Sequence, residues 1–321
     1  MTLTESRPAT MIGAAWATGA VVMFSVNDVL VKFLSGEYAL HEVVLIRSLV
    51  GMCLVLGLIV PLSGGWPVLR TQRLGMHLLR GLCVVFANVC FFLGLAALPL
   101  AEAVAIFFVS PLLISVASVV FLGETVGPRR WGAIGMGLIG VVIVLRPGTD
   151  AFQAASLLPL AAALGYAGLH TLTRKIGGTE GAATLIFYAQ ATFIGTSALI
   201  GLAVGHGEFA GSGHPSLEFL LRGWTVPDLE DFLVMAFVGV ASAAGGYAIG
   251  QAYRLSEAAL VAPFEYAAMP LSVLWGWLVF DELPDAVAFA GIALILASGL
   301  ILVWREAAAR RATVSRPPAP R

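Results

Sequence analysis

Apolar stretches of about 20 residues recur along the whole chain, separated by short polar or glycine- and proline-containing connections. A helix of that length crosses the hydrocarbon core of a bilayer. Lipid offers the backbone no hydrogen-bond partners, and the alternating segments of a transmembrane barrel are absent, so these stretches are predicted to be helices. Ten spans are predicted: Met11–Leu34, His41–Leu62, Gly75–Leu98, Ala101–Gly123, Arg130–Leu145, Ala155–Ile176, Ala182–Val204, Glu230–Arg254, Ala258–Phe280 and Asp285–Trp304.

The connections between these spans differ in length. Those at 177–181 and 281–284 leave room only for tight turns between antiparallel neighbours. The longest, 205–229, contains several apolar residues that could lie flat at the membrane interface, although a flexible loop is the commoner arrangement.

Composition supports a membrane protein. The chain is 59% hydrophobic and 12% charged, with a mean hydropathy of +0.93. Soluble domains are about 45–50% apolar and about 25% charged, so a soluble enzyme is excluded. Disorder requires low hydrophobicity and is excluded too. With 18 Lys and Arg against 19 Asp and Glu, no basic surface favours nucleic-acid binding.

The distribution of basic residues predicts the orientation. With the N-terminus inside, only Lys32, Arg47, Arg146 and Arg222 of the 18 Lys and Arg residues fall away from the inner side. Cytoplasmic connections are enriched in these residues. We therefore expect both termini in the cytoplasm, and a basic tail at 305–321.

The two halves of the chain resemble each other. Pro111, Gly132 and Gly140 have counterparts 159 residues later, Leu100–Ala103 resembles Leu255–Ala258, and Val31-Lys32 resembles Arg174-Lys175. Because each half contains five predicted spans, the second half must enter the membrane in the opposite direction. The expected fold is an all-α integral membrane protein whose ten helices form two inverted five-helix repeats, an organisation typical of transporters.

The segments Leu100–Pro147 and Ala258–Trp304 resemble EamA domains of the drug/metabolite transporter superfamily. The resemblance implies one repeat at 11–146, a second at 155–304, and a central cavity lined by the first four helices of each half. It implies secondary transport of small molecules across a bacterial inner membrane, without ATP or another cofactor. Proton coupling and a homodimer are compatible with it.

The segment Ala262–Tyr266 resembles family members that carry riboflavin or S-adenosylmethionine inward. We therefore expect uptake of a small polar metabolite, such as an aromatic one. An exporter of amino acids or other metabolites is the alternative within the family. A membrane enzyme is disfavoured because serine-hydrolase and P-loop signatures are missing, and a non-transporting sensor because polar groups occur inside apolar helices.

Ionisable groups inside predicted spans are the candidate functional residues, because a charge at the bilayer centre costs about 2.5–3.5 kcal/mol or more. Glu265 lies near the middle of the ninth span, and its counterpart in the first half is Ile106. The repeat itself therefore does not require a carboxylate there. Glu265 is expected to bind a substrate donor or a proton; the alternative is a neutral structural glutamate.

Two further groups of residues complete the candidate site. Asp28 and Lys32 share one face of the first span, and Arg47 lies at similar depth, which favours either a structural ion pair or a gate. Proline breaks are expected at Ser110-Pro111 and Met269-Pro270. Polar or aromatic side chains assigned to substrate binding are Tyr266, Asn88, Ser110, His170, Gln190 and Tyr188. His170 and Glu265 together could relay a proton.

Two motifs have simpler explanations. Gly135–Gly140 spells GxGxxG, but it lies inside a predicted membrane helix, where glycines allow close helix packing rather than dinucleotide binding. His41-Glu42 lacks the second histidine of a zinc motif, so no metal site is expected.

Overall fold

The computed structural model describes residues 7–123, 127–150, 152–176, 180–255, 261 and 264–314. Every regular element in those ranges is helical, as the apolar spans predict. The second span contains a π-helical turn at Val55–Ile59, and 3-10 turns occupy Trp66–Leu69 and Ala154–Ser156. The α-helices are α1 (Arg7–Leu34), α2 (Leu40–Leu54), α3 (Val60–Leu62), α4 (Leu74–Ala97), α5 (Leu100–Phe107), α6 (Ser110–Leu122), α7 (Pro128–Leu145), α8 (Leu157–Ile176), α9 (Ala182–Val204), α10 (Pro215–Leu221), α11 (Leu229–Leu255), α13 (Ala268–Phe280) and α14 (Ala286–Val314).

Nine stretches of the described chain are long and apolar enough to cross a membrane. One of them, Leu100–Phe121, combines α5 with α6, and the shorter apolar helix α13 has 13 residues. The predicted span 258–280 begins at residues that lie outside the described part of the chain. The protein is therefore a multi-pass helical membrane protein, and the count of ten spans is approximate.

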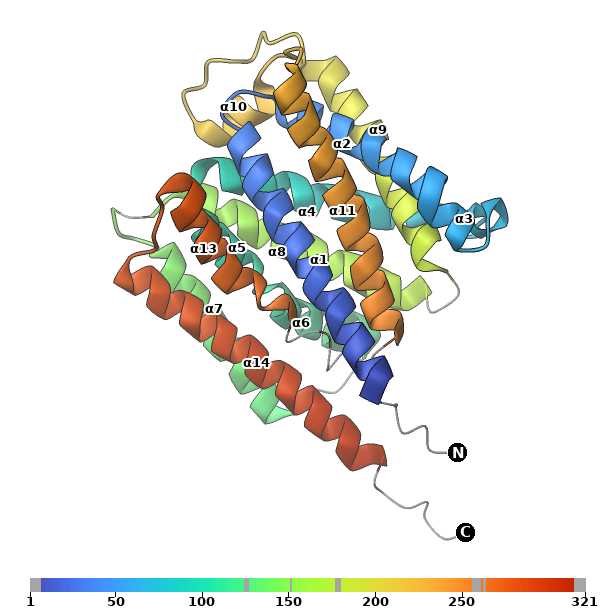
Figure 1. Cartoon of the computed structure of the whole chain (residues 1–321). Coiled ribbons are helices and arrows are strands. Elements are labelled where there is room, and N and C mark those ends of the chain that lie inside the picture. Colours follow the sequence, from blue (N-terminus) through green and yellow to red (C-terminus); the bar gives the residue numbers. More distant parts are fainter. Residues whose placement is uncertain are drawn as a thin grey trace.

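Helices from the two halves interleave rather than forming separate bundles (Figure 1). The most extensive contacts join α1 to α11, α4 to α8, and α7 to α14. In order of crossing, the first pair joins the first and eighth spans, and the second pair joins the third and sixth. The first and sixth spans occupy equivalent positions in the two halves, and so do the third and eighth. The two contacts are therefore equivalent, as expected for two copies of one unit that face each other.

Successive spans alternate in direction, so their connections gather at two ends of the molecule. Figure 1 shows that α1 begins and α14 ends at the same end, which we call the terminal end. The connection at 63–73 and residues 180–181 belong to the terminal end. The connections at 35–39, 205–228 and 281–285 belong to the opposite, distal end.

The long connection at 205–228 is packed, contrary to the expectation of a flexible loop. It contains α10, whose Phe219 is fully buried and whose Ser216 Oγ donates to the Leu93 carbonyl at 2.7 Å. A Cβ atom on Gly205 would come within 2.1 Å of the Trp224 ring, so this glycine admits the indole. Apolar burial holds the segment over the distal end, which pattern analysis missed because the helix is only one or two turns long.

Glycines allow a close helix approach between α7 and α14. A Cβ on Gly140 would lie 2.9 Å from the Gly291 carbonyl oxygen, and a Cβ on Gly291 would lie 2.9 Å from the Gly140 carbonyl oxygen. A Cβ on Gly137 would meet Leu112 at 2.1 Å. The GxGxxG segment is thus a packing surface at Gly137 and Gly140, whereas Gly135 faces open space.

Gly140→Val is expected to lower the unfolding free energy by about 1–3 kcal/mol more than Gly135→Val. Both changes replace a helical glycine of α7 with the same side chain, so intrinsic helix propensity cancels and only packing differs. The thermal unfolding of both variants in detergent checks this. Equal destabilisation would show that the α7–α14 approach does not depend on Gly140.

Candidate functional site

The fourth span, Leu100–Phe121, is interrupted by a turn. Helix α5 ends at Phe107, residues 108–109 form a turn, and α6 begins at Ser110 with Pro111 in its first turn. A proline is tolerated in a first turn because its missing N–H would have no helical partner there. Ser110 is buried, with 3% of its surface exposed.

The second half has a matching break. Residues 264–265 are helical, Tyr266 and Ala267 form a turn, and α13 begins at Ala268. Pro270 lies in the first turn of α13. Glu265 therefore sits at the end of one helical segment and just before the start of the next, which is how discontinuous helices present groups to substrates in transporter folds.

Aromatic rings gather around the first break. Phe107 contacts Phe91 at a centroid distance of 4.9 Å and Tyr166 at 5.3 Å. Tyr166 also contacts the His170 ring at 4.4 Å. The turn residue Phe108 contacts Tyr266 of the second break at 5.4 Å. We call this set the aromatic cluster: Phe91, Phe107, Phe108, Tyr166, His170 and Tyr266.

Two opposite charges act on the aromatic cluster. Tyr166 lies within electrostatic reach of both Glu265 and Arg80. Arg80 is held in place by two bonds to the second half: its Nε donates to Thr173 Oγ1 at 2.9 Å, and its Nη1 donates to the Leu185 carbonyl at 3.2 Å. Arg80 was counted among the inner-side charges in the sequence. Its position two turns inside α4 is the signal that could have marked it as an intramembrane group.

Tyr266 occupies a packed position within the cluster. It is 2% exposed, and a Cβ on Gly299 would come within 2.1 Å of its hydroxyl oxygen. The ring therefore fills a space against α14. The structure places His170 and Tyr266 in the aromatic cluster, and Glu265, which directly precedes Tyr266, acts electrostatically on Tyr166.

Asn88 lies elsewhere, beside Arg47. Arg47 Nη2 donates to Asn88 Oδ1 at 3.2 Å, and its guanidinium lies 5.0 Å from each of the Phe92 and Phe193 ring centroids. Asp28 accepts a bond from Asn27 Nδ2 at 3.1 Å and attracts Arg47 at longer range. These contacts join α1, α2, α4 and α9.

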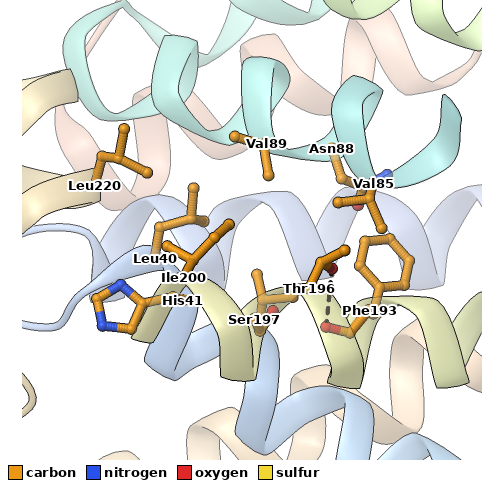
Figure 2. Close-up of a pocket in the computed structure, with 11 residues that line it drawn as sticks. Leu40, His41, Val85, Asn88, Val89, Phe193, Thr196, Ser197, Ile200 and Leu220 are labelled. Atoms are coloured by element: carbon orange, nitrogen blue, oxygen red, sulfur yellow. Dashed lines mark hydrogen bonds between the residues drawn. The ribbon is translucent and has the colours of Figure 1, made fainter. Parts of the chain in front are cut away.

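A small pocket lies next to Asn88. Figure 2 shows Asn88 and Val85 of α4 facing Phe193 and Thr196 of α9 across it. Its volume is about 10 Å³, which is room for roughly one water molecule. The pocket is too small for a metabolite, so it does not extend the aromatic cluster.

The two candidates of α9 also lie away from the cluster. Tyr188 stacks on His77 with centroids 4.6 Å apart, and its hydroxyl donates to the Leu69 carbonyl at 3.0 Å. Gln190 is 5% exposed, and a Cβ on Gly51 would lie 2.3 Å from its Nε2. Gln190 therefore fills the contact between α9 and α2.

Lys32 joins the two halves at the distal end. Its Nζ lies 2.9 Å from Glu282 Oε2 and donates to the Leu98 carbonyl at 2.6 Å. Glu282 Oε2 also accepts from the Leu100 backbone N–H at 3.2 Å. The sequence offered Asp28 as a partner of either Lys32 or Arg47. The structure pairs Lys32 with Glu282, while Asp28 interacts electrostatically with Arg47. A partly open cavity of about 310 Å³ lies beside this pair.

Comparison with known proteins decides the family. A family model described as the EamA-like transporter family matches residues 11–146. The riboflavin transporter of Vibrio cholerae is 30% identical over 304 residues, which cover 93% of this chain and 95% of that protein. The chain belongs to the EamA-like transporter family.

Other relatives of this EamA-like transporter carry different names. The S-adenosylmethionine uptake transporter of Rickettsia bellii is 26% identical, covering 92% of this chain and 94% of that protein. The pseudopaline exporter of Pseudomonas aeruginosa is 27% identical, covering 90% and 95%. A crystal structure at 22% identity superposes with a TM-score of 0.61 over 95% of this chain and 98% of the other, which shows the fold alone.

Exchanging the charges of the distal pair should test its role in this EamA-like transporter. Lys32→Glu places a second carboxylate opposite that of Glu282 and is expected to lower the unfolding free energy by about 1–3 kcal/mol. Adding Glu282→Lys should recover part of that loss, with a coupling energy of about 0.5–3 kcal/mol. Recovery is incomplete because a glutamate at 32 faces the Leu98 carbonyl. Thermal unfolding of both single variants and the double variant measures the coupling, and strictly additive effects would exclude the pairing.

Proposed function

We propose that this transporter carries a small, flat, polar metabolite of the riboflavin or S-adenosylmethionine kind inward across a bacterial inner membrane. The repeats at 11–146 and 155–304 rock about the aromatic cluster, with the termini and the basic tail 305–321 in the cytoplasm. Glu265 and Arg80 hold the polar parts of the substrate, and Tyr166, Phe107 and His170 hold its ring.

The observation that carries this proposal is the position of Tyr166. The phenol contacts the rings of Phe107 and His170, and it lies within reach of a carboxylate and a guanidinium. A planar ring gains about 0.5–1.5 kcal/mol from each well-placed aromatic contact.

The chemistry of the relatives' named substrates fits such a site. Riboflavin has a flat ring whose imide edge offers N–H and C=O groups. S-adenosylmethionine has a flat adenine, a cationic sulfonium and an amino-acid end. In both cases a carboxylate can accept from donors or face a cation, and a guanidinium can bind oxygen acceptors.

The broken spans support a moving site. Both breaks lie at equivalent positions of the two halves, and α5, which precedes the first break, contacts α13, which follows the second. Rigid-body rocking of two repeats about a midplane site is the usual mechanism of inverted-repeat transporters. Export is the second candidate, since one relative is named as a pseudopaline exporter.

Glu265→Gln is expected to reduce riboflavin counterflow in proteoliposomes by about tenfold or more, because a hydrogen bond to a charged group contributes about 1.5–3 kcal/mol. Glu37→Gln, at an exposed distal position, is the matched control and should leave counterflow unchanged. Riboflavin should also raise the unfolding temperature of the wild-type protein. At 100 times its dissociation constant, the ligand adds about 2.7 kcal/mol to the free energy of unfolding.

The outcomes of these measurements separate the parts of this proposal. Equal counterflow in Glu265→Gln and wild type would remove Glu265 from the site. Thermal stabilisation by S-adenosylmethionine but not riboflavin would select the second named class. If Glu265→Gln loses counterflow because it aggregates, Glu265→Asp provides the test instead. This variant keeps the charge and should retain partial counterflow activity.

A further inference from the structure

A buried histidine at the terminal end takes no part in the aromatic cluster. His77 lies in the first turn of α4 and is 1% exposed. Neither ring nitrogen has a hydrogen-bond partner. A neutral imidazole normally donates through one nitrogen and accepts through the other, so a buried ring with neither bond is costly, by about 1–3 kcal/mol.

The carboxylate of Glu180 lies next to this ring. His77 Nε2 lies 3.6 Å from Glu180 Oε2, which is within ion-pair range but beyond a hydrogen bond. Thr71 Oγ1 donates to the other oxygen, Oε1, at 2.9 Å and so holds the carboxylate in place. The Tyr188 ring, stacked on the imidazole with an interplanar angle of 27°, fixes the plane of the histidine. A proton on Nε2 would complete the contact.

The contact joins the two halves. His77 belongs to α4 in the first half, whereas Glu180 and Tyr188 belong to α9 and the residues that precede it. Two further bonds run beside it: Thr184 Oγ1 donates to the Val68 carbonyl at 2.7 Å, and Tyr188 donates to Leu69. These three contacts hold the two halves together at the terminal end, whereas the Lys32–Glu282 pair does so at the distal end.

We infer that His77 and Glu180 form a proton-binding site that controls opening of the terminal end. The imidazolium donates to Glu180 and holds α4 against the start of α9. When the proton leaves, the contact weakens and the terminal end opens. Because the protonated pair holds the terminal end closed, the proton enters from the distal side and leaves to the terminal side as that end opens, and this order couples its movement to the movement of the substrate.

Among the described residues, Glu180 and Tyr188 face His77 from the second half. Arg73 directly precedes α4, and Arg80 lies one turn beyond His77 on that helix. Helix α8 ends a few residues before Glu180, and its last turn contains Arg174 and Lys175, whose side chains lie outside the described part of the chain.

At the distal end, two groups keep their charge state between pH 5.5 and 8. The Arg146 guanidinium holds the pKa of Asp285 at about 2, and the bond to Asp231 raises the pKa of Tyr38 to about 12. A pH response in that range would therefore not arise from these distal groups.

The first experiment needs no substrate. Spin labels at Gln72→Cys and Ala191→Cys, both exposed positions, report the separation of the first half from α9 in the full-length protein with its native cysteines replaced by alanine. We expect a narrow distance distribution at pH 5.5 and a longer, broader one at pH 8. In His77→Gln the distribution should be the same at both pH values.

The second experiment rests on the proposed function and uses riboflavin as its probe. A gradient of two pH units, acidic outside the proteoliposomes, should stimulate wild-type uptake, since one coupled proton provides up to about 100-fold drive. His77→Gln and Glu180→Gln should lose this stimulation by about tenfold or more while retaining counterflow. The matched control is His206→Gln, because His206 and Glu208 form an exposed histidine–glutamate contact at 3.9 Å within one half.

The two experiments separate the possible failures. If wild type neither binds nor moves riboflavin, the proposed substrate is wrong, and the spin-label distances still decide the proton site. If His77→Gln keeps the pH response of those distances, or full gradient stimulation, the proton site is wrong. Glu180→Gln supplies the same two tests should His77→Gln fail to fold.

Discussion

The bilayer core supplies no hydrogen-bond partners to the backbone, and the rest of this structure depends on that constraint. It makes every described span helical, and it makes an interrupted helix costly unless neighbouring protein shields the turn. Two spans are nevertheless interrupted, at equivalent places after Phe107 and after Glu265. Both turns are covered by aromatic side chains, and both place a proline in the first turn of the following helix, where no backbone bond is lost.

The same constraint explains how the charges are placed. Arg47 is 2% exposed, yet two phenyl rings lie 5.0 Å from its guanidinium and Asn88 accepts one of its bonds. Cation–π contacts contribute about 2 kcal/mol when desolvated, which is comparable to the cost of inserting an arginine on translocon scales. Arg47 can therefore serve as a structural cross-link between α2, α4 and α9. Glu265 and Arg80 differ from Arg47 in that both act electrostatically on Tyr166, a member of the aromatic cluster.

Periodicity and composition predict most of the fold but only part of the site. Runs of about 20 apolar residues identify spans because their length is set by membrane thickness, and the half-to-half spacing of Pro111 and Pro270 locates both breaks. Depth along a helix, however, says little about which way a side chain points. Gln190 and Glu265 both fall inside predicted spans, yet Gln190 packs against Gly51, whereas Glu265 acts electrostatically on Tyr166. The pairing of Lys32 with Glu282 was not predicted, because a contact between residues 250 positions apart has no local signal.

Cross-half contacts exist at both ends of this one conformation, so a change of access must break one set while the other holds. Shifting a two-state equilibrium from 1:99 to 99:1 requires about 5.5 kcal/mol of differential interaction. A ligand can move such an equilibrium only as far as its affinities for the two states differ. Under the function proposed above, the contacts of the substrate with the aromatic cluster would therefore have to be stronger in one state than in the other. That difference would add to whatever the cross-half contacts at the two ends contribute.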